Sequence, residues 1–304
     1  MRIRHAGRVC DGIWCLGRLE SDVYLLEGRD SSLIISGGIS AIIPDVLSQF
    51  KSFKIDESRI TGLLILHAHF DHLGIIPFLK RRMPQLKVYA SSRAWKVLTN
   101  PKAIETINTF SSFTNELLGA KQSLSSFDAE WRDDVKGTTI GEGEALDLGS
   151  MTVKIMETPG HSSCSISAYV PEMKALFASD GGGIPFRDEI IPSGNSNYTQ
   201  FEQSLMRLNA LDVEYLCADH YGYVTGDEAR AFIGNAIEAA KLFRELMETV
   251  YRRTGSIDDA VNELVENTMA THSDYFLPKD ILTTVYQQMM KHIASVSEGR
   301  HQVN

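Results

Sequence analysis

The sequence predicts an α/β protein with a C-terminal helical extension, and three observations carry this prediction. Short apolar segments closed by glycine fill the first third of the 304-residue chain, as at residues 12–17 (Gly-Ile-Trp-Cys-Leu-Gly). Strand and helix patterns then alternate as far as residue 220. From residue 226 to about residue 296 the apolar spacing is helical throughout, which indicates a separate helical part.

The composition and charge limit the classes of function. A hydrophobic content of 43% is enough to fill a substantial core, which argues against a disordered chain. A net charge of −9 argues against nucleic acid as a partner, because such binding depends on lysines and arginines that neutralise phosphates. There is no uncharged apolar span of about 18 residues and no signal-peptide pattern, so we expect a cytoplasmic protein without a membrane partner.

The predicted elements follow from local patterns taken in chain order. Strands are expected where β-branched and apolar residues form short runs, several of them closed by glycine, and helices where apolar residues recur every three or four positions. The expected strands are 12–17, 21–28, 31–38, 60–66, 86–91, 144–149, 151–160, 164–170, 175–180 and 213–220. The expected helices are 40–50, 72–83, an insertion at about 101–127, 198–211, 227–253, 256–270 and 279–295. We expect a catalytic domain at 1–225 and a helical cap packed on it at 226–304.

Three histidines and an aspartate stand within six residues after the buried strand at 60–66. His67, His69, Asp71 and His72 lie in the sequence Leu-Ile-Leu-His-Ala-His-Phe-Asp-His-Leu-Gly. A loop can turn all four side chains into one volume, whereas a continuing strand would alternate them between two faces. Imidazole and carboxylate groups brought together in this way need a cation among them, and a divalent metal ion is the usual one.

Three further candidate ligands also stand where a strand gives way to a loop. His161 follows a Pro-Gly turn, Asp180 follows an apolar run and precedes three glycines, and His220 ends the apolar strand at 213–220. Ligands delivered from several strand ends to one edge of a sheet are typical of α/β sites. The four cysteines are scattered without a Cys-x-x-Cys pair, so we expect free thiols rather than disulfides or a cysteine-based zinc site.

The order of these motifs over about residues 10–225 resembles the metallo-β-lactamase-fold hydrolase superfamily, whose signature is His-x-His-x-Asp-His. The resemblance implies an αββα sandwich of two mixed sheets with two divalent metal ions at one edge. Many members carry an aspartate after an early strand, where this chain has Ser36, so the sequence provides no carboxylate at this position to orient the ligands. The implied ligands are His67, His69 and His161 for one ion, and Asp71, His72 and His220 for the other, with Asp180 bridging.

A narrower resemblance concerns the thioesterase-like branch that includes the quinolone-signal biosynthesis hydrolase. It rests on Gly-Gly-Ile-Ser at 37–40, Ile-Pro-Phe-Leu at 76–79 and Asp-Tyr-Phe-Leu-Pro at 274–278. This branch implies a thioester or ester of a small acyl or aromatic acid as substrate. We expect Gly182, Tyr275 and Phe276 to line the substrate pocket, with the helical extension acting as a cap or as a homodimer interface.

The expected chemistry is metal-dependent hydrolysis. Two divalent ions lower the pKa of water toward neutrality and can share a bridging hydroxide, so no serine or cysteine nucleophile is needed. Asp71 or Asp180 is expected to accept the proton as the nucleophile attacks. Zinc is the first expectation for the ions, with iron and manganese as alternatives.

Two other functions remain open at this point, and a third is disfavoured. One is a glyoxalase-II-like hydrolysis of a glutathione thioester, although the extension lacks an obvious basic cluster for the glutathione carboxylates. Another is a regulatory protein that keeps the metal site but acts by binding an effector. A di-iron redox protein is disfavoured, because that branch usually replaces the second histidine of the cluster with glutamate, and this chain has His69.

Overall fold

A computed structural model describes residues 1–301 of the chain. By its internal contacts the chain forms two compact units, which are described separately. Unit 1 comprises Met1–Glu157, Cys164–Asp180 and Asp212–Phe232, and unit 2 comprises Thr158–Ser163, Gly181–Leu211 and the chain from Ile233 onward. The domain boundary expected between residues 225 and 226 stays a prediction.

Sheet 1 of unit 1 begins antiparallel and ends parallel. Its order is β2-β3-β4-β5-β6-β7-β8, with antiparallel neighbours up to β5 and parallel neighbours from β5 to β8. The strands are β2 (Gly7–Cys10), β3 (Ile13–Arg18), β4 (Ser21–Glu27), β5 (Ser32–Ile35), β6 (Ile60–Leu64), β7 (Lys87–Ala90) and β8 (Thr138–Thr139).

Sheet 2 of unit 1 is mostly antiparallel. Its order is β1-β14-β13-β12-β11-β10-β9, and among these neighbours β12 and β13 pair in parallel. The strands are β1 (Arg2–Ile3), β9 (Ala145–Asp147), β10 (Thr152–Glu157), β11 (Ile166–Val170), β12 (Ala175–Phe177), β13 (Tyr215–Cys217) and β14 (Tyr223–Thr225). The sequence did not indicate β1, β2, β8 and β14, which have two to four residues each.

The two sheets pack face to face through one apolar core. Side chains along β4 alternate, since Tyr24 and Leu26 join the core between the sheets while Leu25 joins the core on the opposite face of sheet 1. The ring of Tyr24 on sheet 1 meets the ring of Phe177 on sheet 2 edge to face, with centroids 5.3 Å apart. Both faces of sheet 1 are therefore buried, as the continuous apolar strands indicated.

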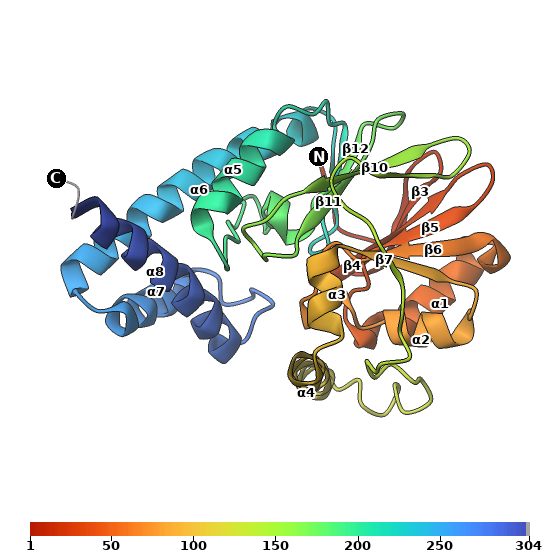
Figure 1. Ribbon diagram of the computed structural model, residues 1–304, viewed down its shortest axis with the longest axis horizontal. Coiled ribbons are helices and arrows are strands. Elements are labelled where there is room, and N and C mark those ends of the chain that lie inside the picture. The colour runs from red at the N-terminus through yellow and green to blue at the C-terminus, as the bar shows by residue number, and fades with distance from the viewer. Residues whose placement is uncertain (302–304) are drawn as a thin grey trace. The chain divides into compact units, whose positions relative to one another are not determined.

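Helices cover the other face of sheet 1, as Figure 1 shows for α1, α2 and α3. They bury side chains such as Phe50 and Leu79 against Leu63 and Ile65 of the strand and loop at β6. The helices of unit 1 up to this point are α1 (Ile43–Ser52), α2 (Ile76–Arg82), α3 (Ser92–Leu98) and α4 (Pro101–Leu117). The α/β sandwich expected from the sequence is confirmed.

The helix expected over 101–127 ends ten residues early. Gly119 has a φ of +63°, and its N–H bonds to the carbonyl of Glu116 while the Ala120 N–H bonds to that of Asn115. This pair of bonds is the Schellman arrangement, in which a glycine adopts the left-handed conformation just past the last helical turn.

Unit 2 is mainly helical. Helices α7 and α8 lie side by side (Figure 1) and bury Leu264 and Val265 of α7 together with Met290 and Ile293 of α8. Tyr198 of α5 donates a hydrogen bond of 2.8 Å to the Ala240 carbonyl of α6. The helices are α5 (Tyr198–Leu208), α6 (Asp227–Thr254, most of it in this unit), α7 (Ile257–Thr271) and α8 (Lys279–His301). No helix within residues 1–301 is long and apolar enough to span a bilayer.

Candidate metal centre

The loop after β6 is fixed by its backbone. The chain leaves β6 at Leu64 and forms a 3-10 turn at Phe70–His72 before α2 begins. The N–H of Gly74 donates to the Gly38 carbonyl at 2.6 Å, and the N–H of Ile75 donates to the Gly37 carbonyl at 2.9 Å. These bonds tie the cluster to the loop after β5, so the histidines project from a held segment rather than from a free loop.

Parallel strand pairing places the candidate residues of unit 1 at strand ends that lie side by side. Strands β5 and β6 are parallel neighbours, as are β12 and β13, and the carboxyl ends of parallel strands meet at one edge of a sheet. The residues that follow these four strands are Ser36, the His67–His72 loop, Asp180 and the pair Asp219 and His220.

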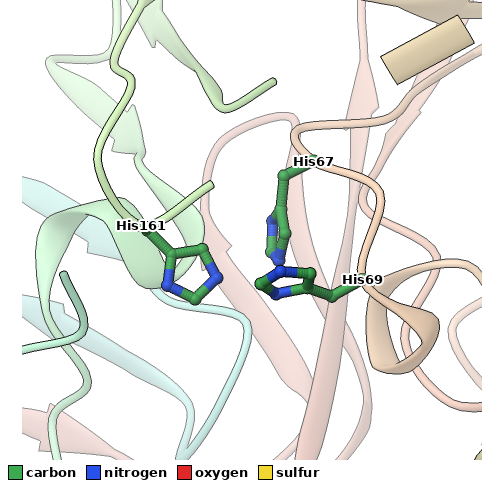
Figure 2. Close-up of side chains that lie close together, drawn as sticks. All are labelled: His67, His69 and His161. Atoms are coloured by element: carbon green, nitrogen blue, oxygen red, sulfur yellow. The ribbon is translucent and has the colours of Figure 1, made fainter. Parts of the chain in front are cut away.

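The histidines and aspartates named from the sequence form three groups able to hold a metal ion. Within each group the nitrogen and carboxylate oxygen atoms all lie within 4.8 Å of one another, and Figure 2 shows the three imidazoles of the first group. The groups are His67, His69 and His161; His67, His72 and Asp180; and Asp71, His72 and His220. All of these side chains are buried except His69, which is half-buried.

Asp71 and Asp180 lie against the imidazoles of His72 and His220. The Nε2 atom of His72 lies 3.3 Å from Asp180 Oδ2 and 3.6 Å from Asp71 Oδ2. His220 Nε2 lies 3.5 Å from Asp180 Oδ1 and 3.7 Å from Asp71 Oδ2. His72 Nε2 is buried and makes no hydrogen bond with any residue that the structure describes. A buried nitrogen facing two carboxylates at these distances suits a shared cation, so the residues present fit divalent metal ions.

The charges around His72 also favour a bound cation. Burial lowers the pKa of His72, but the neighbouring charges of Asp71 and Asp180 outweigh burial and hold that pKa well above its ordinary value. The two carboxylates therefore favour positive charge between them, in the form of a proton or of a metal ion.

Outer hydrogen bonds engage the second ring nitrogen of four of these histidines. Nδ1 of His220 lies 2.6 Å from the Glu20 carbonyl, and Nδ1 of His161 lies 2.8 Å from the Ser193 carbonyl. Because a carbonyl only accepts, these Nδ1 atoms carry the proton and leave Nε2 with its lone pair. His72 Nδ1 lies 2.9 Å from Asp219 Oδ2, and His67 Nδ1 lies 3.3 Å from the Ser179 hydroxyl.

Asp219 and Ser179 are contacts that the sequence did not single out. The Ser36 hydroxyl donates at 2.8 Å to Asp219 Oδ2, the atom that also contacts His72. A carboxylate thus stands beside the ligands, although it comes from the end of β13 rather than from the end of β5. The one signal in the sequence was its position directly before His220.

The three predicted pocket residues all belong to unit 2. Gly182 is buried and ends the 3-10 turn Ser179–Gly182. The ring of Tyr275 lies edge to face on Phe186 and on Phe276, with centroids 5.2 and 5.0 Å apart. Their role in binding substrate stays a prediction. All four cysteines are free thiols, as expected.

Comparison with known proteins agrees with this architecture. The protein is similar over 205 residues to the metallo-beta-lactamase fold-containing protein ST1585 of Sulfurisphaera tokodaii, with 26% identity, covering 67% of this chain and 73% of that one. It is also 26% identical over 170 residues to a hydroxyacylglutathione hydrolase of Rhodopseudomonas palustris, covering 54% of this chain and about half (49%) of that enzyme.

A solved structure and a family model extend the comparison. The metallo-beta-lactamase family protein TTHA1429 from Thermus thermophilus superposes with a TM-score of 0.67 and 15% identity, over 96% of this chain and 95% of that one. The model of the metallo-beta-lactamase superfamily matches residues 16–220, a span that contains every predicted metal ligand. The chain belongs to the metallo-beta-lactamase superfamily.

Proposed function

We propose that this protein is a dinuclear metal-dependent hydrolase that cleaves a thioester or ester of a small acyl or aromatic acid. The observation that carries the proposal is the set of three overlapping His and Asp groups, which together use all seven predicted ligands. Related proteins include a hydroxyacylglutathione hydrolase and a probable metallo-hydrolase. These names support hydrolysis over binding alone.

The imidazoles and the carboxylates of the site have different roles in this proposal. Divalent ions bound here would lower the pKa of water and polarise the carbonyl of the substrate. The imidazoles offer Nε2 because their Nδ1 atoms are engaged elsewhere. Asp71 and Asp180 are 8% and 5% exposed, and in this proposal one of their carboxylates would accept a proton from the water molecule. Six of the seven side chains are buried, which limits the access of bulk water and strengthens each of these interactions.

The substrate class rests on two further observations. Relatives named as hydroxyacylglutathione hydrolases support a thioester. In unit 2, however, Arg187 pairs with Asp274 and Arg244 pairs with Glu202, so these two cations are already engaged and do not offer a site for the carboxylates of glutathione. An acyl or aromatic group facing Tyr275 and Phe276 is therefore the leading proposal, and a glutathione thioester is the alternative.

The test is hydrolysis of a panel of substrates by protein of known metal content. The panel contains alkyl and aryl thioesters, the matching oxygen esters, a 2-hydroxyacyl glutathione thioester and a phosphodiester. We expect turnover of the simple thioesters, with Asp180→Ala losing both turnover and bound metal. The control is Asp11→Ala, because the Asp11 side chain is 88% exposed and pairs with Arg8, three residues earlier and outside the predicted ligands.

Each other outcome has a distinct meaning. Unchanged turnover in Asp180→Ala, or full activity in a strong chelator, contradicts a metal-dependent mechanism. A clear preference for the glutathione thioester favours the glyoxalase-II-like alternative. Bound metal without hydrolysis of any substrate in the panel favours a regulatory protein.

A further inference from the structure

Asp219 is a buried carboxylate that joins several parts of the metal centre. It is 2% exposed and stands between β13 and the predicted ligand His220. Its Oδ2 atom lies 2.9 Å from His72 Nδ1, and it accepts hydrogen bonds from the hydroxyls of Ser36 at 2.8 Å and Ser179 at 2.5 Å. Its Oδ1 atom has no hydrogen-bond partner among the residues that the structure describes.

The direction of each hydrogen bond follows from the donors available. An ionised carboxylate only accepts, so His72 contributes the proton on Nδ1 and Ser179 contributes its one hydroxyl proton. The Ser179 oxygen is then left to accept, and the donor beside it is Nδ1 of His67 at 3.3 Å. One carboxylate therefore sets the tautomer of His72 directly and that of His67 through a serine, and the neutral form of each ring has its lone pair on Nε2.

The backbone provides an independent observation. Ser36 and Ser179, the two serines that hold Asp219, have φ angles of +69° and +48°. The left-handed conformation is unfavourable for residues with a Cβ and is normally taken by glycine. Both serines adopt this conformation, and both hydroxyls donate a hydrogen bond to Asp219 Oδ2. Glycine would suit the backbone better, so the presence of serine indicates that the hydroxyls are needed.

We propose that Asp219 is the positioning residue of the metal centre, holding His67 and His72 in the tautomer and orientation that present Nε2 to the ions. Ser36 and Ser179 fix the carboxylate, and Ser179 relays its effect to His67. The proposal rests on the metal centre of the proposed function but not on the substrate, so it holds for any reaction performed there.

The test measures zinc affinity by competition with a chromophoric chelator, together with thermal unfolding of the metal-free protein. We expect Asp219→Asn to weaken zinc binding roughly 10–100-fold, the usual effect of removing a partner of a metal-ligating histidine. Ser179→Gly should weaken zinc binding in the same direction, while the metal-free variant unfolds at the same or a higher temperature because the left-handed backbone is relieved. If Ser179 had only a structural role, Ser179→Gly would instead lower the unfolding temperature of the metal-free protein.

A matched control and a rescue complete the design. Asp22 on β4 is equally buried, and its backbone N–H bonds to the Asp219 carbonyl, a bond that the substitution keeps. Its carboxylate contacts the Gly222 N–H and the Cys15 thiol instead of a predicted ligand, so Asp22→Asn should keep zinc affinity within about twofold. The double variant Ser36→Asp with Asp219→Ser moves the carboxylate to the end of β5, where the Ser36 hydroxyl lies 2.8 Å from the Asp219 oxygen that contacts His72, and should recover at least tenfold of the lost affinity.

The outcomes separate this inference from the proposed function. Zinc affinity that is unchanged in either Asp219→Asn or Ser179→Gly overturns the inference, whatever the double variant does. An equal loss in Asp22→Asn also overturns it, because burial of a carboxyl group would then be the cause. Loss of affinity in both variants, in a protein that hydrolyses none of the thioesters, supports the inference while the proposed function fails.

Discussion

Replacing Gly74 with alanine tests whether the loop of predicted ligands must sit where its backbone bonds hold it. A Cβ atom on Gly74 would lie 2.0 Å from the Ser40 nitrogen and 2.4 Å from the Ile39 carbonyl carbon. Ordinary contact needs about 3.5 Å, so the two segments must separate by roughly 1.5 Å. Both neighbours are backbone atoms, and neither can turn aside as a side chain would.

The size of the effect follows from that displacement. Overpacking of this kind costs about 1–3 kcal/mol of the free energy of unfolding. For a domain of this size the melting temperature should fall by roughly 2–12 °C. Metal ligands tolerate shifts of only about 0.2 Å, so a loop moved by more than 1 Å should lower zinc affinity about 100-fold.

The assay is calorimetric unfolding together with zinc titration, and the chain offers a matched control. Gly234 lies inside α6, and a Cβ there would meet Asn209 Oδ1 at 3.5 Å, an ordinary contact. Gly234→Ala should stabilise the protein by about 0.5–1 kcal/mol and leave zinc affinity unchanged, because alanine favours a helix interior. If Gly74→Ala behaves like Gly234→Ala in both measurements, the close approach of Gly74 to the backbone of Ile39 and Ser40 does not position the ligands.

Three further predictions concern the core, a thiol and the predicted pocket. Phe177→Ala should cost about 3–5 kcal/mol in denaturant unfolding, because the fully buried ring fills the space between the sheets; a cost below 1 kcal/mol would contradict the sandwich core. Cys10 should react slowly with a thiol reagent at pH 8 and much faster above pH 10, because burial and the charge of Asp11 outweigh Arg8 and raise the pKa of its thiol to about 11; rapid reaction at pH 8 would refute this. Phe276→Ala should raise KM for aryl thioesters at least fivefold more than for acetyl thioesters, and an equal change for both would remove Phe276 from the pocket.

Much of the fold was predictable because its signals are local. Apolar segments that end at glycine gave β3, β4 and β5, and the continuous apolar run at 60–66 gave β6 together with the loop that carries the histidines. The seven predicted ligands followed from residue types placed at strand ends, and the structure brings all of them into metal-capable groups. The length of α4 was not predictable from periodicity alone, because Gly119 ends the helix through its backbone conformation.

The residues that support the ligands could not be predicted from one sequence. Asp219 is separated by 183 positions from Ser36 and by 147 from His72, and only the pairing of strands at one sheet edge brings these side chains together. An aspartate at the end of a buried strand has the same local pattern whether it holds a ligand or faces solvent. Its function becomes visible only when its hydrogen-bond partners are known.

Anomalous X-ray diffraction at the zinc absorption edge, from crystals grown with zinc, locates bound ions directly. We expect two peaks, one about 2.0–2.1 Å from the imidazole nitrogens of His67 and His69, and one at the same distance from those of His72 and His220. Asp180 should lie between the two peaks. No peak at these residues in protein that hydrolyses a thioester, or zinc found only on exposed side chains, would contradict the assignment of this cluster as a metal centre.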